Sequence, residues 1–405
     1  MDDPAKKITA YLEAHRSEMT DFLATLVSIN SVTYHEERAV AWLQERLEAF
    51  GYDEAYIDAA GNCAGRIGRG PAVILADAHV DTVEPGSPAD WGFDPLQPRI
   101  TGNTIAGRGV VDDKGPLTAL IFAGRAIKEL GLGEGLTYWL SASISEEDVE
   151  GSCVRAMMEL NPRIKPGGII VAEASGMKII RGHKGRALIR MEVAGKAAHA
   201  SAAWRGENAL IKAIPLIQAI DRRRCDREDP FLGRGSIEVT TVICDTPSLN
   251  TIPGRATVIA DRRISCGESP EELLEELKPL LELSGARAFI DTEEVTTYRG
   301  YKIEQSDYFP SWIMPEDHPL IRAGAGAYRE VLGKTPAIES WSFCTNAAYL
   351  CGITGIPAIG FGPGDPALCH SPEEILSLED LVAAAAVYAK IALNFAAAPE
   401  AAHPA

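Results

Sequence analysis

Apolar residues recur along the first half of the chain in two alternating patterns, one with the period of a helix and one in short continuous runs. The runs at residues 72–76, 136–144 and 168–172 are bounded by glycine or charged residues and predict buried strands. Helical periodicity covers residues 5–26 and 36–50. This alternation of helices and strands predicts an α/β layer with a mostly parallel sheet.

A different pattern begins near Gly185. Its order, strand–helix–strand–strand–helix–strand, predicts a ferredoxin-like βαββαβ sandwich inserted into the α/β layer. The predicted elements are strand 188–193, helix 207–220, strands 236–244 and 256–264, helix 270–283 and strand 286–291.

The α/β pattern then resumes with a helix at residues 320–332 and a strand at 356–361. A chain of 405 residues is long for one core, so two domains are expected. The predicted domains are a discontinuous catalytic domain, residues 1–183 and 297–405, and an inserted domain, residues 184–296.

The bulk composition argues against several classes of protein. Hydrophobic residues make up 46% of the chain, and no run approaches the about 20 apolar residues that span a bilayer, so a membrane protein is not expected. A formal net charge of -18 repels phosphate backbones and argues against nucleic-acid binding. The eight cysteines lack Cys-x-x-Cys spacing, and the first residues lack a signal-peptide pattern. We therefore expect free thiols and a cytoplasmic protein.

Histidine and acidic residues follow the predicted buried strands, or lie in loops beside them. The carboxyl ends of strands in an open α/β sheet meet at one edge, where such folds place their sites. We therefore expect these side chains to lie together. They are His79, Asp81, Asp112, Glu146, Glu147, Glu173 and His370.

These residue types indicate a metal centre. A single histidine or acidic pair is usually surface charge, but a buried strand end disfavours carboxylates unless a cation compensates them. Imidazole and carboxylate without thiolate suit zinc, with cobalt and manganese as alternatives. One shared carboxylate would hold two ions about 3.5–4 Å apart. Asp81 is placed to orient His79, and one of Glu146 and Glu147 is left free to take a proton from water.

In this order the motifs resemble the M20 family of metallopeptidases and deacylases, over nearly the whole chain. They are His79-x-Asp81, Gly107-Arg108-Gly109-Val110-Val111-Asp112-Asp113-Lys114-Gly115, Glu146-Glu147, Glu173 and the segment 364–370. The resemblance implies a phosphorylase/hydrolase-like catalytic domain with two metals and an inserted lid domain. It implies that His79 and Glu173 hold one metal, Glu147 and His370 hold the other, Asp112 bridges them, Asp81 supports the site and Glu146 is the general base.

The resemblance also points to substrate-binding residues in the inserted domain. His199, in the segment 195–201, looks like the family's lid histidine, which polarises the scissile carbonyl and often belongs to the partner of a homodimer. Asn250 and Arg263 look like lid residues that meet substrate oxygens, and an arginine fork suits a carboxylate. Strand alternation lets only one of Arg262 and Arg263 face the substrate, and the sequence leaves open which one.

One branch of the family, the selenium metabolism-linked hydrolases, resembles the chain in further motifs. These are Arg181-Gly182-His183-Lys184-Gly185-Arg186, Asp229-Pro230-Phe231-Leu232-Gly233, Tyr308-Phe309-Pro310, Pro315-Glu316-Asp317-His318-Pro319 and the segment 360–365. The chain departs from the wider family at Cys344-Thr345-Asn346-Ala347, where Gly-Thr-Asp-Ala is usual. The missing carboxylate at Asn346 is expected to affect chemistry at the substrate end.

The expected activity is hydrolysis of an amide-type C–N bond in a small N-acyl or N-carbamoyl amino acid by a metal-activated hydroxide. Glu173, where aminopeptidase relatives tend to have aspartate, favours a deacylase. The alternatives are a dipeptidase or carboxypeptidase on the same scaffold, and an inactive metal-binding or regulatory homologue.

Overall fold

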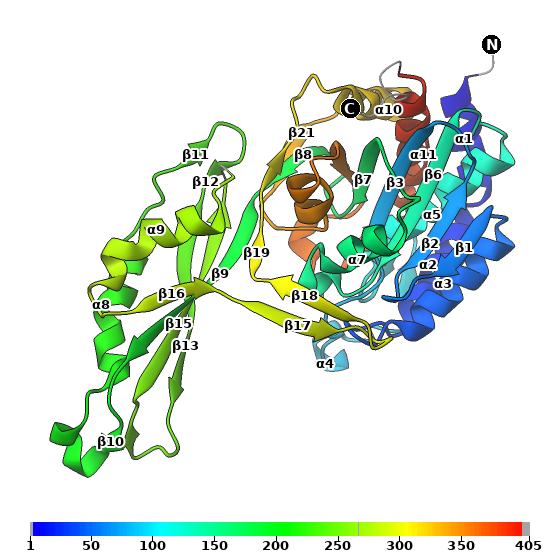
Figure 1. The fold of residues 1–405 in the computed structure, drawn as a ribbon. Helices are drawn as coiled ribbons and strands as arrows, with labels where there is room; N and C mark the ends of the chain where they lie inside the picture. Colours follow the sequence, from blue (N-terminus) through cyan, green and yellow to red (C-terminus); the bar gives the residue numbers. More distant parts are fainter. Residues whose placement is uncertain (1–2, 266, 399–405) are drawn as a thin grey trace.

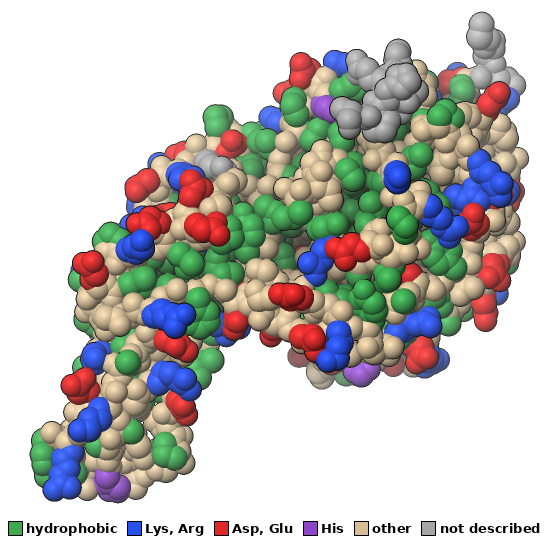
Figure 2. All heavy atoms as spheres, viewed as in Figure 1, with side chains coloured by type: hydrophobic (Ala, Val, Ile, Leu, Met, Phe, Trp, Pro, Cys, Tyr) green, Lys and Arg blue, Asp and Glu red, His purple; other side chains and the backbone are tan. Residues whose placement is uncertain are grey.

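The computed structural model describes residues 3–265 and 267–398 and folds them into two units, each with its own main hydrophobic core (Figure 1). The larger unit is built on a nine-stranded sheet, and the smaller unit on a five-stranded sheet that projects from its side. Basic and acidic side chains are interspersed over both units on the face shown in Figure 2.

The nine-stranded sheet is mixed. Its four central strands, β6, β3, β7 and β22, run parallel as the sequence predicts, whereas β1, β2, β8 and β20 join this group through antiparallel pairs. In sheet order the strands are β1 (Glu54–Ile57), β2 (Cys63–Ile67), β6 (Leu136–Ser143), β3 (Ala72–His79), β7 (Gly168–Ala172), β22 (Ala358–Phe361), β8 (Ile179–His183) and β20 (Trp312–Ile313), with β21 (Ile338–Trp341) beside β8.

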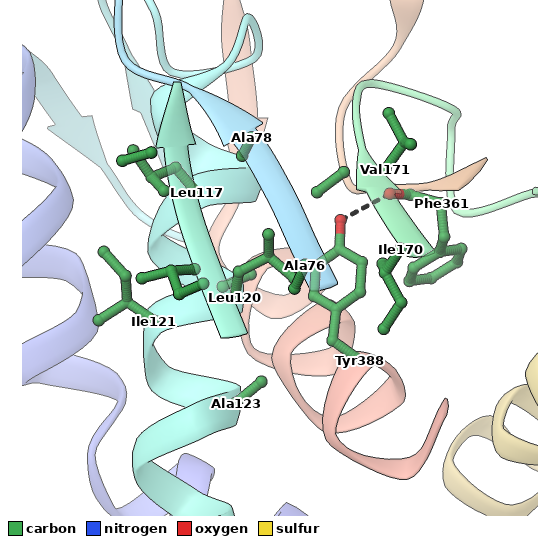
Figure 3. Packing of buried hydrophobic residues seen from close by; sticks show 14 of the residues in the cluster. Ala76, Ala78, Leu117, Leu120, Ile121, Ala123, Ile170, Val171, Phe361 and Tyr388 are labelled. Carbon is green, nitrogen blue, oxygen red and sulfur yellow. Dashed lines mark hydrogen bonds between the residues drawn. The ribbon is translucent and has the colours of Figure 1, made fainter. Parts of the chain in front are cut away.

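Helices pack against this sheet and form the larger core with it. They are α1 (Pro4–Ala14), α2 (Arg16–Ser28), α3 (Glu37–Ala49), α5 (Lys114–Glu129), α7 (Ser152–Leu160), α10 (Pro319–Leu332) and α11 (Leu378–Ala396), with the short α4 (Pro88–Trp91) and α6 (Glu146–Val149). Leu117 and Leu120 of α5 belong to the same buried cluster as Ala76 and Ala78 of β3 (Figure 3). Tyr388 of α11 is buried, and its hydroxyl donates to the Phe361 carbonyl at 2.6 Å, so the ring enters the core without an unpaired polar atom.

The smaller unit has the predicted βαββαβ order. Its strands pair in the order β13-β15-β9-β16, and β19 adds to β9. Helix α9 begins with a capping box between Ser269 and Glu272, which satisfies backbone N–H groups that a helix start leaves unpaired. The elements are β9 (Gly185–Ala194), α8 (Ala209–Asp221), β13 (Ser236–Asp245), β15 (Arg255–Ile264), α9 (Pro270–Leu281), β16 (Arg287–Ile290) and β19 (Tyr308–Phe309).

Short strand pairs complete the fold. The predicted domain boundaries fall at the end of β8 and at the end of β17, and the division into domains stays a prediction. The pairs are β10 (Ala198–His199) with β14 (Thr251–Ile252), β11 (Glu228–Asp229) with β12 (Gly233–Arg234), β17 (Thr292–Thr296) with β18 (Lys302–Ser306), and β5 (Thr104–Ala106) with both β4 (Arg99–Thr101) and β23 (Ile375–Ser377).

Two of the chain segments that run between the units lie side by side. One runs from β8 into β9, and the other from β19 into β20. Trp312 pairs with His183 in the larger sheet, and Phe309 pairs with Arg186 in the smaller one, so the connections form one antiparallel ribbon. A Cβ on Gly185 would lie 2.4 Å from the Phe309 carbonyl oxygen, so this close approach needs glycine.

Two of the differences from the predicted elements have a clear local cause. The helix expected over residues 5–26 is two helices that break at His15, whose Nδ1 lies 2.7 Å from the Tyr11 carbonyl oxygen. Strand β22 begins at Ala358, later than expected, because Pro357 has no N–H to give to the ladder. Among the described helices, none is long and apolar enough to cross a membrane.

Candidate metal centre

The predicted metal ligands meet at one edge of the nine-stranded sheet. His79 is the last residue of β3, and Glu173 directly follows β7. Glu147 lies in α6, four residues after the end of β6. Asp112 comes from the loop before α5, and His370 follows the short helix η3 (Pro366–Leu368). The structure therefore brings all five side chains together from five separate segments.

The five side chains form two groups that share Asp112. In the first group, Nε2 of His79 lies 3.0 Å from Oδ1 of Asp112 and 3.7 Å from Oε1 of Glu173. In the second, Nε2 of His370 lies 3.1 Å from Oδ2 of Asp112 and 2.9 Å from Oε2 of Glu147. Within each group one ligand atom from every residue lies within 4.8 Å of the others. One carboxylate thus offers an oxygen to each of two cation positions.

Acidic side chains are buried close together here, and this burial shifts their pKa values. Burial, followed by the charge of Glu173, raises the pKa of Glu146 well above its ordinary value. Burial alone would raise the pKa of Asp112 as well, but hydrogen bonds from His370 and His79 lower it. Hydrogen bonds to Asp112 and then to Glu147 raise the pKa of His370 to about 10.

These donors fit a pair of divalent ions. Buried carboxylates at this density need positive charge nearby, and the two histidines can carry at most one positive charge each against the five carboxylates of Asp81, Asp112, Glu146, Glu147 and Glu173. Both groups consist of imidazole and carboxylate donors, which suit zinc, cobalt or manganese.

Asp81 contacts two of the predicted ligands and the predicted base. Its Oδ1 accepts the backbone N–H of Glu146 at 3.0 Å, and its Oδ2 accepts that of Glu147 at 3.2 Å. Nδ1 of His79 lies 3.0 Å from the Asp81 backbone oxygen and 3.5 Å from its Oδ1. One buried aspartate therefore orients parts of both ligand groups.

Glu146 belongs to neither ligand group. Its Oε2 lies 3.9 Å from Nε2 of His79, so it faces the ligands without joining them. Ser145, just before it, has a left-handed backbone with φ of 54°. The buried carboxylate of Glu36 holds this turn by accepting the N–H and the hydroxyl of Ser145 at 3.0 and 2.9 Å. Sequence reasoning missed Glu36, because a glutamate at a predicted helix start resembles surface charge.

Glu374 is a second supporting residue that sequence reasoning missed. Its Oε1 accepts the backbone N–H groups of Gly109, Val111 and Asp112 at 3.0, 2.9 and 3.1 Å. Its Oε2 accepts from Nη1 of Arg108 at 2.9 Å, and both side chains are buried. Glu374 therefore shapes the loop that presents the shared ligand. The sequence could have indicated Glu374 only by its position, four residues after the predicted ligand His370.

A cavity of about 350 Å³ opens beside the ligands. Arg263 lines it, whereas the Arg262 side chain points into the smaller unit and pairs with Glu268 at 2.8 Å. Of the two arginines that the sequence left open, Arg263 is therefore the one that lines the cavity. The lining residues are Asp112, Glu146, Glu147, Glu150, Glu173, Arg186, Arg263, Phe343, Cys344, Pro366, Cys369 and His370.

His199 and Asn250 lie elsewhere in the chain. His199 is exposed in β10, which Figure 1 places at the far end of the smaller unit, away from the nine-stranded sheet. Its Nε2 lies 3.2 Å from Nδ2 of Asn250. The fold thus brings these two predicted residues to each other, and neither lines the cavity of its own chain.

Asn346 is not among the residues that line the cavity, although Cys344 of the same motif is. It is buried, and its Nδ2 donates to Asp77 at 2.8 Å and to Ser143 at 2.9 Å. Its Oδ1 accepts the N–H of Gly151 at 2.8 Å. An aspartate here would put a second carboxylate against buried Asp77, so asparagine fits this interior position.

Comparison with known proteins gives one consistent family. The sequence model described as Peptidase family M20/M25/M40 matches residues 75–394. The chain is 35% identical over 399 residues to the uncharacterized protein YgeY of Escherichia coli (strain K12), covering 97% of this chain and 98% of that protein. It is 27% identical over 385 residues to the succinyl-diaminopimelate desuccinylase of Methylobacterium sp. (strain 4-46), covering 90% of this chain and 93% of that one.

A solved structure shares the fold. The M20 family metallo-carboxypeptidase Sso-CP2 from Sulfolobus solfataricus matches with a TM-score of 0.75 and 18% identity. The match covers 93% of this chain and 98% of that chain, so it includes both the larger and the smaller unit.

Proposed function

Because this chain belongs to peptidase family M20/M25/M40, we propose that it is a two-metal hydrolase that cleaves the amide C–N bond of a small N-acyl or N-carbamoyl amino acid. The observation that carries the proposal is the position of Asp112, whose two carboxylate oxygens each face the histidine of a different ligand group. Zinc is the proposed metal, with cobalt or manganese as alternatives. The free thiols of the described cysteines suit the proposed cytoplasmic location.

Each catalytic role follows from where a side chain lies. Two divalent cations held by these residues would polarise the scissile carbonyl and lower the pKa of a bound water to about 7. Glu146, beside the ligands and outside both groups, takes the proton of the attacking water and passes it to the leaving nitrogen. Asp81 keeps Glu146 and Glu147 in place through their backbone N–H groups.

The cavity favours an acylated nitrogen over a free amine. Four of its five carboxylates are the proposed ligands and base, and the fifth, Glu150, is paired with Arg186 at 3.1 Å. The free α-ammonium group of a dipeptide would therefore have to compete with Arg186 for the carboxylate of Glu150. The relative named as a desuccinylase supports the same choice, because it acts on an N-acyl group by its name.

Substrate screening tests this proposal. Full-length protein loaded with zinc, cobalt or manganese is incubated with N-acetyl, N-succinyl and N-carbamoyl amino acids and with dipeptides, and release of free amino acid is measured. We expect the highest kcat/KM within the N-acyl or N-carbamoyl set. Higher kcat/KM for dipeptides would favour the dipeptidase alternative, and no turnover with intact metal content would favour the inactive homologue.

We propose further that the enzyme is a homodimer joined through the smaller unit. Helix α8 exposes Leu210, Ile211 and Ile214, with 58% of Ile211 accessible. The neighbouring edge strand β13 exposes Val242 and Ile243. Exposed apolar side chains beside an unpaired strand edge are typical of a protein–protein interface. A second copy covering this face could also bring His199 to a site that its own chain does not reach.

Mixing two inactive variants tests whether His199 acts in trans. His199→Ala is expected to lose about 10²–10³-fold in kcat, as removal of a carbonyl-polarising donor does. Glu146→Gln lacks the base. In a mixed dimer one site has both residues intact, so exchange of subunits is expected to restore up to about a quarter of wild-type activity.

The matched control mixes Glu146→Gln with Glu146→Gln/His199→Ala, which contains no intact base and is expected to stay inactive. Sedimentation verifies that the chains exchange. If they exchange without recovery of turnover, His199 does not act in trans.

A further inference from the structure

We propose that Arg186 is a specificity-determining residue that binds the free carboxylate of the substrate together with Arg263. This inference rests on the proposed function, because it names the part of the amide substrate that the enzyme selects. Both arginines line the cavity beside the metal ligands. The sequence assigns a role to Arg263 and none to Arg186.

Strand register places the two arginines side by side. Arg186 is the second residue of β9, and Arg263 lies directly opposite it on the antiparallel strand β15. Opposite residues of a pair share a face of the sheet, about 4.5–5.5 Å apart between Cβ atoms. Both side chains are half-buried, whereas their neighbours Ala187 and Arg262 point into the core. The pair therefore presents two guanidinium groups to the same cavity.

Two like charges directly opposite each other repel, and the structure compensates each one separately. Nη2 of Arg186 lies 3.1 Å from Oε2 of Glu150. Nε and Nη2 of Arg263 donate to the two carboxylate oxygens of Asp261 at 2.7 and 3.2 Å. Each arginine is thus held by an acidic residue of its own.

Donors remain on Arg186 after this pairing. Glu150 engages Nη2 of Arg186, and the half-buried side chain lines the cavity, so the guanidinium still offers N–H groups there. The guanidinium lies 4.9 Å from the ring centroid of Phe309, which fixes the plane of the donor fork. An arginine fork with spare donors, held against a ring and facing a cavity, matches the planar geometry of a carboxylate.

The substrate class follows from this arrangement. A carboxylate has two oxygens with about four lone-pair sites, enough to accept from both arginines. A primary carboxamide has one acceptor oxygen. Its two N–H donors would face the guanidinium groups of Arg186 and Arg263, which are donors as well. We infer that the enzyme selects N-acyl or N-carbamoyl amino acids with a free α-carboxylate over their amides and over internal peptide bonds.

Binding of a matched acid and amide pair tests the proposal without turnover. The zinc-loaded, full-length Glu146→Gln protein is titrated calorimetrically with N-acetyl-L-alanine and with N-acetyl-L-alaninamide. We expect it to bind the acid more tightly, and Arg186→Met in this background to weaken acid binding about 10- to 100-fold, the effect of charge-assisted hydrogen bonds. Amide binding is expected to change less than about threefold, since it does not use the charge.

Two further variants separate this role from a structural one. Arg186→Lys keeps a positive charge beside Glu150 and is expected to fold normally with an intermediate loss of acid preference. Arg190→Met removes an arginine from the same face of β9, where it pairs with Asp291 and Asp307 outside the cavity, and is expected to leave the preference unchanged.

The inference is overturned if Arg186→Met and Arg186→Lys weaken binding of the acid and of the amide equally. It is also overturned if the Glu146→Gln protein itself binds the acid no more tightly than the amide, or binds neither ligand. Failure of the proposed function has a different outcome. In that case the unsubstituted enzyme hydrolyses no N-acyl or N-carbamoyl amino acid, while an acid preference that depends on Arg186 persists.

Discussion

Replacing Glu146 by glutamine is expected to lower kcat by about 10²–10⁴-fold, the usual contribution of general acid–base catalysis, while two metal ions stay bound. The side chain lies outside both ligand groups, so the amide should remove proton transfer and leave the metal ligands in place. Metal content is measured by elemental analysis, and turnover with the substrate found by screening.

A neighbouring acid serves as the control. Asp148 lies in the same short helix and accepts from the Tyr34 hydroxyl, outside the metal cavity. Asp148→Asn should therefore change kcat by less than about twofold. Unchanged turnover in Glu146→Gln would exclude Glu146 as the base, and loss of a metal ion would reassign it as a ligand.

Glu374→Ala is expected to lower the free energy of unfolding of the larger unit by about 3–5 kcal/mol, because it leaves the buried Arg108 guanidinium without its partner. The same change releases three backbone N–H groups of the loop that carries Asp112, so metal affinity should fall with stability. Urea denaturation and metal titration measure the two effects.

Glu373→Ala is the matched control, because Glu373 is adjacent in sequence and exposed. Its effect should stay within about 0.5 kcal/mol, as for surface substitutions. A Glu374→Ala protein with the stability and the metal content of the control would show that the loop holds its shape without this carboxylate.

The sequence predicted which side chains meet at the sheet edge, because strand ends are a property of the local pattern. His79 and Glu173 follow continuous apolar runs, and parallel strands carry such positions to one edge. Roles that depend on long-range contacts could not be predicted in this way. Glu374 contacts a loop more than 260 residues earlier in the chain, and no periodicity marks that pairing.

Orientation was the other property hidden from the sequence. Arg262 and Arg263 are adjacent residues of the same type, so the sequence alone does not distinguish them. The register of β15 against β9 and the pairing with Glu268 show that Arg262 is the one in the core. Asn346 lies in a motif associated with the site, yet its side chain is enclosed by Asp77, Ser143 and Gly151. Which way a buried amide points depends on partners that are distant in the sequence.

The paired connections between the units have a mechanical consequence. A ribbon of two hydrogen-bonded strands resists shear within its plane, because shear would break the pairs, and bends more easily across that plane. The hairpin β17–β18, which packs Val295 and Ile303 against the larger core, is a second brace between the units. We therefore expect a swing of the smaller unit about the ribbon to be small in angle. Arg186 lies on the ribbon itself, at its pair with Phe309, whereas β10 lies at the far end of the unit (Figure 1). The same swing would displace the arginine pair slightly and the tip that carries His199 through a much longer arc.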